Sequence, residues 1–280
     1  MGAIQPITIG DLYNRYLVPP GKKIKLSDYD PNDTAGLEKT PAVKKKFHEN
    51  LGEIGRLARM LYAEGKRAFL GIAQSMDTGG KDRLIRKVLK RVDPNYMQVT
   101  HFKAPTEVDR RYPPIKRILE CIPPKGSMGM FHRSHYEDIL FPRVEGGASE
   151  SIWKPLYEQN NDIEKMLSEH GIKIVKFFLY ISKDEGGERL RERLNNPEKQ
   201  HKFNPRDIEA RKHWDKYMEA YEDILNNCST EWAKWFVLPA NHQWFKDLAA
   251  SEIVLKELES LNLKYPEPTF DPSVIEMAKM

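Results

Sequence analysis

The segment 69–82 constrains the fold more than any other part of the chain. An apolar run comes first, then a turn of small residues, and then Lys81 with a basic amphipathic segment behind it. This order is typical of a buried strand, a loop whose backbone N–H groups hold a phosphate, and the first turn of a helix. The match to the phosphate-loop pattern G-x-x-x-x-G-K-[ST] is irregular, because Ser75 and Asp82 replace its first glycine and its hydroxyl residue.

The rest of the chain alternates apolar runs with amphipathic segments, which predicts an α/β fold. Strands are expected at 66–73, 97–102, 128–131, 172–181 and 235–238. Helices are expected at 42–64, directly after the loop, at 151–169, from Ser182, at 207–226 and at 243–261. Because the predicted strands are apolar on both faces, we expect a parallel sheet covered by helices on both sides.

Composition narrows the class of protein. The 280 residues are 40% hydrophobic, enough for one large domain or two small ones with a sizeable core. A net charge of +4 does not require nucleic acid, although local basic clusters can bind a polyanion. No apolar run approaches the ~20 residues of a membrane span and no signal-peptide pattern opens the chain, so we expect a cytoplasmic protein. Cys121 and Cys228 lack metal or redox spacing and are expected to be buried thiols.

Several short segments, taken in chain order, resemble the polyphosphate kinase 2 family. The loop Asp77-Thr-Gly-Gly-Lys81-Asp82 matches the family pattern D-x-x-G-K-D, and its Lys-Asp pair is most similar to the one-domain class III members. The resemblance covers about residues 10–265. The other matching segments are 102–105 (F-K-x-P), 129–138 (similar to G-x-F-N-R-S-H-Y-E-D), 176–179, 182–183, Arg189, Arg193, 213–214, 221–223 and 235–239.

This resemblance implies a three-layer α/β/α sandwich of the P-loop kinase type, similar to thymidylate kinase, with a helical lid. The expected organisation is an extended N-terminal arm at 1–40, a kinase-like domain at 41–265 with its lid at about 189–210, and a C-terminal tail at 266–280. The polar break at 195–201 would belong to the lid, whereas composition alone also allows a surface loop.

The resemblance also implies an activity and partners. The expected reaction is phosphoryl transfer between inorganic polyphosphate and nucleoside mono- or diphosphates (AMP/ADP, GMP/GDP), with Mg²⁺ or else Mn²⁺. Homo-oligomers, dimers or tetramers, are usual in the family, and no nucleic acid or membrane partner is expected.

Phosphoryl transfer requires positioning and charge neutralisation, and the candidate residues suit that work. Lys81 is expected to contact phosphate oxygens as a point charge, and Arg133 to bind two of them as a fork. Asp77 is expected to bind the metal ion or to position the acceptor, because position 82 carries an acid in place of the usual hydroxyl. Glu137 either assists the metal or forms a cap or ion pair.

A second set of residues is expected to surround the phosphates. Arg189 and Arg193 lie four apart on one helix face, which is unfavourable unless an anion or an acid lies between them. The basic face after the loop either lines a polyphosphate groove or is simply solvated. Candidates for phosphate or polyphosphate binding are Gly79, Gly80, Asp82, Arg86, Lys87, Lys103 and Arg117.

Departures from the family pattern fall at functional positions and leave two alternatives open. They are Ser75, Arg83-Leu84, the segment 112–117, His132 and Leu156. His132 stands where the family usually has Asn or Asp beside the metal, and imidazole is a poor ligand for Mg²⁺, so this side chain leaves the metal short of one oxygen or turns aside. The alternatives are an ATP-dependent kinase of nucleotides or other small molecules, and a catalytically impaired homologue that binds polyphosphate or nucleotide.

Overall fold

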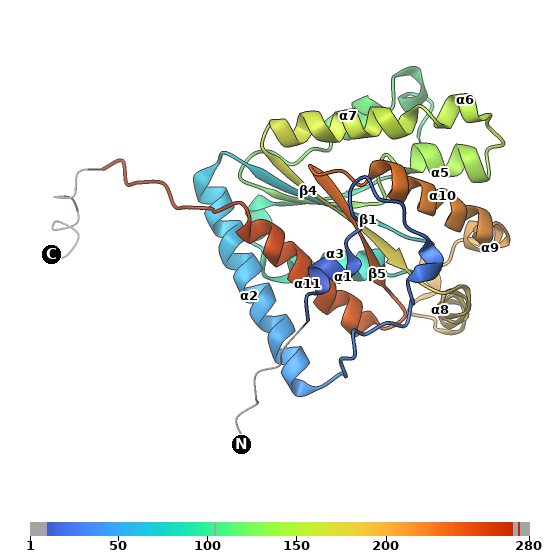
Figure 1. The fold of residues 1–280 in the computed structure, drawn as a ribbon, viewed down its shortest axis with the longest axis horizontal. Coiled ribbons are helices and arrows are strands. Elements are labelled where there is room, and N and C mark those ends of the chain that lie inside the picture. The colour runs from blue at the N-terminus through green and yellow to red at the C-terminus, as the bar shows by residue number, and fades with distance from the viewer. Residues whose placement is uncertain (1–9, 104, 271–273, 275–280) are drawn as a thin grey trace.

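The computed structural model of the chain describes residues 10–103, 105–270 and 274. Within these residues, five strands form one all-parallel sheet in the order β2-β3-β1-β4-β5 (Figure 1). The strands are β1 (Ala68–Gln74), β2 (Met97–His101), β3 (Met128–His132), β4 (Ile172–Tyr180) and β5 (Ala233–Pro239). Each lies where the sequence predicts a strand, so the predicted parallel sheet is confirmed.

The central strand, β1, is buried along its whole length, because parallel strands are covered on both faces. It pairs with β3 on one side and with β4 on the other. The carboxyl ends of these strands meet at one edge of the sheet. The loop that follows β1 therefore opens where open α/β sheets bind their ligands.

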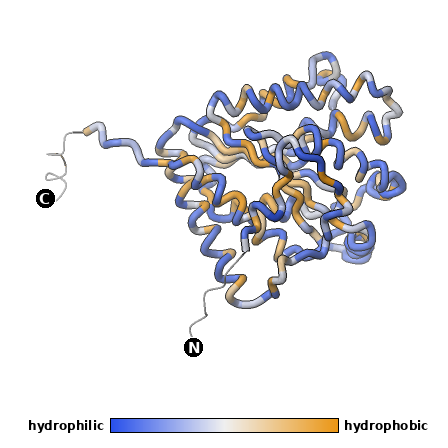
Figure 2. The backbone as a smooth tube through the Cα atoms, viewed as in Figure 1, coloured by the Kyte–Doolittle hydropathy of each residue, from blue (hydrophilic) through white to orange (hydrophobic). Residues whose placement is uncertain are grey.

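Helices cover both faces of the sheet, which confirms the three-layer α/β/α architecture (Figure 1). One layer contains α2 (Pro41–Glu64), α3 (Lys81–Val88) and α11 (Gln243–Glu259). The opposite layer contains α5 (Glu137–Val144), α7 (Leu156–Glu169) and α10 (Trp214–Cys228). The remaining α-helices of the described residues are α1 (Leu12–Tyr16), α4 (Ile115–Leu119), α6 (Glu150–Trp153), α8 (Lys183–Asn195) and α9 (Pro205–Lys212). Hydrophobic residues gather along the strands and the inner helix faces, as Figure 2 shows.

Local sequence signals explain where these helices begin and end. The Thr40 hydroxyl accepts a hydrogen bond from the Val43 N–H at the start of α2, and Gly65 ends the helix with a left-handed backbone. The predicted cap of α8 is confirmed, since the Ser182 hydroxyl accepts a hydrogen bond from the Glu185 N–H.

Two predicted helices are wrong in extent, because each is divided in two. The predicted helix at 151–169 is divided at Pro155, since α6 ends at Trp153 and α7 begins at Leu156. Proline has no backbone N–H, so a break in the helix at this residue is expected. The predicted helix at 207–226 is split into α9 and α10 at His213, whose backbone (φ −100°, ψ 19°) departs from helical geometry.

The described part of the N-terminal arm packs against the edge of the sheet. Leu17 forms an isolated antiparallel bridge with Phe236 of β5, and the Val18 N–H donates to the Trp235 carbonyl oxygen (2.9 Å). Leu12 and Tyr16 of α1 are buried in the core. Residues 1–9 of the predicted arm, residue 104 of the F-K-x-P segment, and residues 271–273 and 275–280 of the predicted tail lie outside the described residues.

Among the described residues, no helix is both long enough and apolar enough to cross a membrane.

Candidate active site

The loop between β1 and α3 wraps around the ammonium group of Lys81. Thr78 (φ 69°) and Gly80 (φ 92°) adopt the left-handed backbone that the turn requires. Lys81 is the first residue of α3 and is buried; its Nζ donates to the carbonyl oxygens of Ser75 (2.8 Å) and Met76 (3.2 Å) and to the Ser75 hydroxyl (3.3 Å). Ser75, a departure from the phosphate-loop pattern, thus supplies two of the three acceptors. Burial lowers the pKa of Lys81 to about 8, although the negative charge of Asp77 opposes this shift.

A second buried lysine, from α11, donates a hydrogen bond to the loop. Lys246, in the first turns of α11, is fully buried and its Nζ donates to the Gly80 carbonyl oxygen (3.2 Å). The left-handed backbone of Gly80 favours glycine, and a Cβ atom there would lie 2.5 Å from this Nζ, so the end of the Lys246 side chain would have to move. Burial lowers the pKa of Lys246 to about 8, against the attraction of Asp247.

An ion pair joins the loop to the end of β3. The Arg133 guanidinium donates to Asp77 Oδ1 through Nη2 (2.8 Å), so two predicted site residues lie in contact. Arg133 has a left-handed backbone (φ 62°), which is uncommon for a residue other than glycine and recurs at functional sites. Although burial raises the pKa of Asp77, the charges of Lys81 and Arg133 outweigh it and hold that pKa below its ordinary value.

Glu137 completes this charged group from the start of α5. The side-chain amide of Gln74 is oriented so that both its nitrogen and its oxygen form hydrogen bonds. The Gln74 nitrogen donates to Glu137 Oε1 (3.0 Å), and the Gln74 oxygen accepts from the Ser134 N–H (3.1 Å). Burial raises the pKa of Glu137, while the charges of Arg133 and Lys81 act against that shift. Two carboxylates and two cations therefore meet at the carboxyl edge of β1 and β3.

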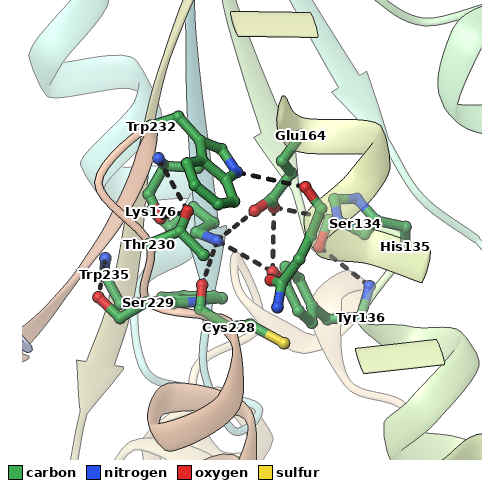
Figure 3. A network of polar contacts seen from close by, with 12 residues as sticks. Ser134, His135, Tyr136, Glu164, Lys176, Cys228, Ser229, Thr230, Trp232 and Trp235 are labelled. Atoms are coloured by element: carbon green, nitrogen blue, oxygen red, sulfur yellow. Dashed lines mark hydrogen bonds and ion pairs between the residues drawn. The ribbon is translucent and has the colours of Figure 1, made fainter. Parts of the chain in front are cut away.

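A buried network fixes the segment between Arg133 and Glu137 (Figure 3). The Lys176 ammonium of β4 is fully buried and donates to Glu164 Oε2 (2.5 Å), to the Tyr136 hydroxyl (3.0 Å) and to the Cys228 carbonyl oxygen (2.7 Å). Glu164 Oε1 accepts the Tyr136 hydroxyl (3.0 Å) and lies 3.3 Å from His135 Nε2. The three ammonium protons are thus matched by three acceptors, and His135-Tyr136 is tied to the sheet.

The helices that span the predicted lid, α8 and α9, lie on the tip of the loop. The Thr78 hydroxyl donates to the Gly186 carbonyl oxygen (3.1 Å), and Arg193 Nη1 lies 3.3 Å from Asp207 Oδ2. Burial, and then the negative charge of Asp77, raise the pKa of Asp207 to about 6. Loop and lid together line a narrow pocket formed by Met76, Asp77, Thr78, Gly186, Leu190, Asp207, Ala210, Arg211 and Trp214.

The guanidinium of Arg189 contacts both the phosphate loop and the segment that follows β5. Its guanidinium donates to the carbonyl oxygens of Thr78 (3.1 Å), Ala240 (2.8 Å) and Asn241 (2.8 Å), and its Nε donates to Glu185 (2.8 Å). It therefore ties the phosphate loop to the end of β5. The acids that relieve the repulsion between Arg189 and Arg193 come from the chain itself, because Glu185 pairs with Arg189 and Asp207 pairs with Arg193.

Two consecutive glycines lie where α8 meets the side chain of Arg211 from α9. Gly186 and Gly187 lie in the first turns of α8, directly under the side chain of Arg211. A Cβ atom on Gly187 would lie 2.9 Å from Arg211 Nη2, and one on Gly186 would lie 3.4 Å from the Thr78 hydroxyl. Arg211 in turn donates to the Lys183 carbonyl oxygen (2.8 Å).

The predicted basic groove is present in part. A groove of about 540 Å³ runs between α3 and the edge strand β2; Arg86, Lys90, Asp82 and His101 line it together with apolar residues, which are Ile85, Leu89, Val92, Pro94, Met97 and Val99. Arg83 is not part of it, because its guanidinium pairs with Asp247 of α11 (2.8 Å). Lys87 is half-buried and Gly79 lies within the loop; neither lines the groove.

Lys103 and Arg117 lie together after β2, apart from that groove. The Lys103 side chain is exposed, and its carbonyl oxygen accepts a hydrogen bond from Arg117 Nη2 (2.6 Å). The Arg117 guanidinium also lies over the Phe102 ring.

His132 turns toward α3. Its Nε2 lies 3.4 Å from Asp82 Oδ1, and its ring stacks on that of His101 with centroids 4.8 Å apart. Burial, and then the charge of Lys81, lower the pKa of His132 to about 4.

Sequence reasoning missed Lys246, Asp207 and His101. Lys246 follows Trp244-Phe245 in an ordinary helix, and no spacing relates it to the loop. Asp207 lies within the predicted lid, but only the fold brings it next to Asp77. His101 is detectable once β2 and β3 are aligned, because the parallel register makes it the partner of His132.

The five-stranded parallel sheet, the phosphate loop with its lysine in the first turn of α3, and the helical lid define a P-loop kinase. The model of the family described as "Polyphosphate kinase 2 (PPK2)" matches residues 36–266. The chain therefore belongs to the polyphosphate kinase 2 family, and the predicted phosphotransferase class is confirmed.

Individual relatives agree with this assignment. An "AMP/ADP-polyphosphate phosphotransferase" of Meiothermus ruber is 41% identical over 91% of this chain and 96% of that protein. An "ADP-polyphosphate phosphotransferase" of Rhodopseudomonas palustris is 33% identical over 91% of this chain and 92% of that protein. The crystal structure of polyphosphate kinase 2 from Arthrobacter aurescens TC1 superposes with a TM-score of 0.93 at 34% identity, covering 99% of each chain.

Proposed function

We propose that this protein transfers phosphoryl groups between inorganic polyphosphate and nucleoside mono- or diphosphates, AMP and ADP among them. The observation that carries the proposal is the charged group of Lys81, Asp77, Arg133 and Glu137 at the carboxyl edge of β1, beneath a lid. The names of the Meiothermus and Rhodopseudomonas relatives support the choice of substrates.

Lys81 is the proposed cation for the transferred phosphate. Its ammonium is held by three acceptors of the loop, so its place at the start of α3 is fixed before a substrate arrives. Phosphate oxygens are stronger acceptors than carbonyl oxygens, so the ammonium would exchange loop contacts for phosphate contacts on binding. The α3 N-terminus adds its unpaired N–H groups at the same place.

Asp77 and Glu137 are the proposed ligands of Mg²⁺. Both are carboxylates beside Lys81, and hard oxygen donors of this kind fit Mg²⁺ or Mn²⁺. When bound, the ion would neutralise charge on the phosphate oxygens. Arg133 holds Asp77 in place and offers a guanidinium fork to the same phosphates.

The outer cations divide into two proposed roles. Arg86 and Lys90 line the groove beside α3 and are proposed to contact the polyphosphate chain. Arg189 is proposed to position the loop, since four of its donor contacts are to protein atoms. Lys103 and Arg117 are proposed to extend the cationic surface beyond β2.

The test is to incubate the purified protein with Mg²⁺, long-chain polyphosphate and AMP, ADP, GMP or GDP separately, and to analyse the products by anion-exchange chromatography. Lys81→Ala and Asp77→Asn are each expected to lower the rate by about a hundredfold or more, because each removes a preorganised charge contact. Lys154→Ala is the control, because its ion pair with Glu150 is exposed and far from the loop. Unchanged turnover in both site variants would exclude the proposed site.

The same experiment separates the alternatives. Turnover that requires ATP and ignores polyphosphate indicates an ATP-dependent kinase. Tight, salt-sensitive polyphosphate binding without turnover indicates a binding homologue. A cytoplasmic location and a homo-oligomeric state belong to the proposal too, and light scattering of the purified chain tests the latter.

A further inference from the structure

Three side chains of types that can bind a metal ion meet beside the first turn of α3. Within residues 10–103, 105–270 and 274, Asp82, His101 and His132 form a group whose ligand atoms all lie within 4.8 Å of one another. The closest pair is Asp82 Oδ1 and His132 Nε2, at 3.4 Å. Ligand atoms of a tetrahedral zinc ion, each about 2.1 Å from the metal, lie about 3.4 Å from one another.

The sheet brings the two histidines together. Parallel pairing of β2 and β3 makes His101 and His132 direct partners at the last position of each strand, so both side chains leave the same face. Their rings stack at 4.8 Å with an interplanar angle of 27°. Asp82, on the first turn of α3, reaches the pair from above the same edge. Three separate elements therefore converge on one point.

The three side chains are also free to ligate. Apart from the contact between His132 and Asp82, neither ring has a hydrogen bond to another described residue. The Asp82 side chain is 65% exposed and His101 is exposed, so both can adjust by the small movement that a common ion requires. His132 is only 17% exposed and provides the fixed point of the group.

We propose that Asp82, His101 and His132 bind a first-row transition-metal ion of the zinc class. Two imidazoles and one carboxylate suit Zn²⁺, Co²⁺ or Ni²⁺, whereas Mg²⁺ requires oxygen ligands. Three protein ligands leave at least one coordination position for water or another oxygen donor. Asp82 and His101 also line the groove that contains Arg86 and Lys90, so the proposed site lies at the wall of an open groove that solvent oxygen donors can enter.

The proposal is tested with the metal alone on the untagged, metal-stripped full chain. Titration with Co²⁺ is expected to give one bound ion per chain with visible absorption bands, and Zn²⁺ is expected to displace it. His101→Asn and His132→Asn are each expected to weaken binding at least about tenfold, since each removes one of three ligands. His101→Asn is the safer variant for folding because the side chain is exposed.

Two controls separate this site from other donors. His48→Asn removes an exposed histidine of α2, and Cys121→Ser removes the partly exposed thiol. Neither is expected to change the stoichiometry or the affinity. Absence of one-to-one binding, equal affinity in both site variants, or a loss caused by either control would overturn the proposal. None of these outcomes depends on phosphotransferase activity.

Discussion

Removing the buried ammonium of Lys176 should leave the carboxylate of Glu164 in the core without its cationic partner. Lys176→Met keeps most of the side-chain volume but deletes the donor that Glu164, Tyr136 and the Cys228 carbonyl share. Glu164 is 1% exposed, so water cannot replace the lost partner. Breaking a buried ion pair by removing one member typically costs about 3–5 kcal/mol. For a domain of this size that corresponds to a fall in Tm of roughly 6–20 °C.

Urea denaturation at pH 7, followed by circular dichroism, measures this loss in free energy of unfolding. Lys154→Met is the matched control, because the same substitution removes an exposed pair with Glu150 and should cost no more than about 0.5 kcal/mol. Adding Glu164→Gln to Lys176→Met should recover about 0.5–3 kcal/mol, since the neutral amide no longer needs the ammonium.

The pH dependence identifies the cause. In the native protein, burial raises the pKa of Glu164, but the charge of Lys176 outweighs it and holds the pKa below its ordinary value. The pair therefore stabilises the fold above the ordinary pKa, and this contribution is lost as the pH falls through the depressed value. In Lys176→Met the largest opposing charge is gone and only the weaker effect of His135 still acts against burial, so Glu164 takes up a proton more readily and the loss should shrink between pH 7 and pH 4. A loss that is equal at both pH values would indicate a cavity effect and refute the reasoning.

Two further predictions concern the loop and the lid. Gly80→Ala should lower the free energy of unfolding by about 1–3 kcal/mol and reduce activity, because the position has a positive φ and faces Lys246. Gly52→Ala is the control, because it lies on open helix surface and should stabilise the fold by about 0.5–1 kcal/mol. A Gly80→Ala variant with unchanged stability would contradict the prediction for the loop. The pKa of Asp207 is raised from 3.8 to about 6, so its contribution to stability is complete below pH 3.8 and is lost as the pH rises through 6. The free energy of unfolding of Asp207→Asn, measured by urea denaturation, should therefore rise by up to about 3 kcal/mol relative to that of the native chain between pH 4 and pH 7. A difference that does not vary with pH would exclude repulsion between Asp207 and Asp77.

Much of the fold was predictable because local rules agree with the global one. The apolar runs predicted all five strands, and the Thr40 and Ser182 caps follow from short-range hydrogen bonding. The divided helices were not separated, because a strong amphipathic pattern continues across Pro155 and across His213. Boundaries of this kind depend on tertiary packing as well as on sequence period.

The site was predictable only where one segment carries it. The role of Lys81 is predicted directly by the loop sequence. The hydrogen bond from Lys81 to the Ser75 hydroxyl was not predicted, and it shows what the serine contacts at this departure from the phosphate-loop pattern. The contact between Arg133 and Asp77 needed the alignment of β1 with β3. The spacing of Arg189 and Arg193 indicates a shared helix face, but it does not reveal the carbonyl oxygens that Arg189 contacts.

The glycine pair at 186–187 has a consequence for engineering. Glycine inside a helix is about 0.5–1 kcal/mol less favourable than alanine, so α8 gives up intrinsic helix stability over two consecutive residues. An alanine at position 187 would place its Cβ 2.9 Å from Arg211 Nη2, so the end of that side chain would have to move away from the Lys183 carbonyl oxygen that it contacts. An alanine at position 186 would make only ordinary contacts, the nearest at 3.4 Å. Attempts to raise heat resistance by replacing helical glycines with alanine should therefore succeed more readily at Gly186 than at Gly187, although the two residues are adjacent in α8.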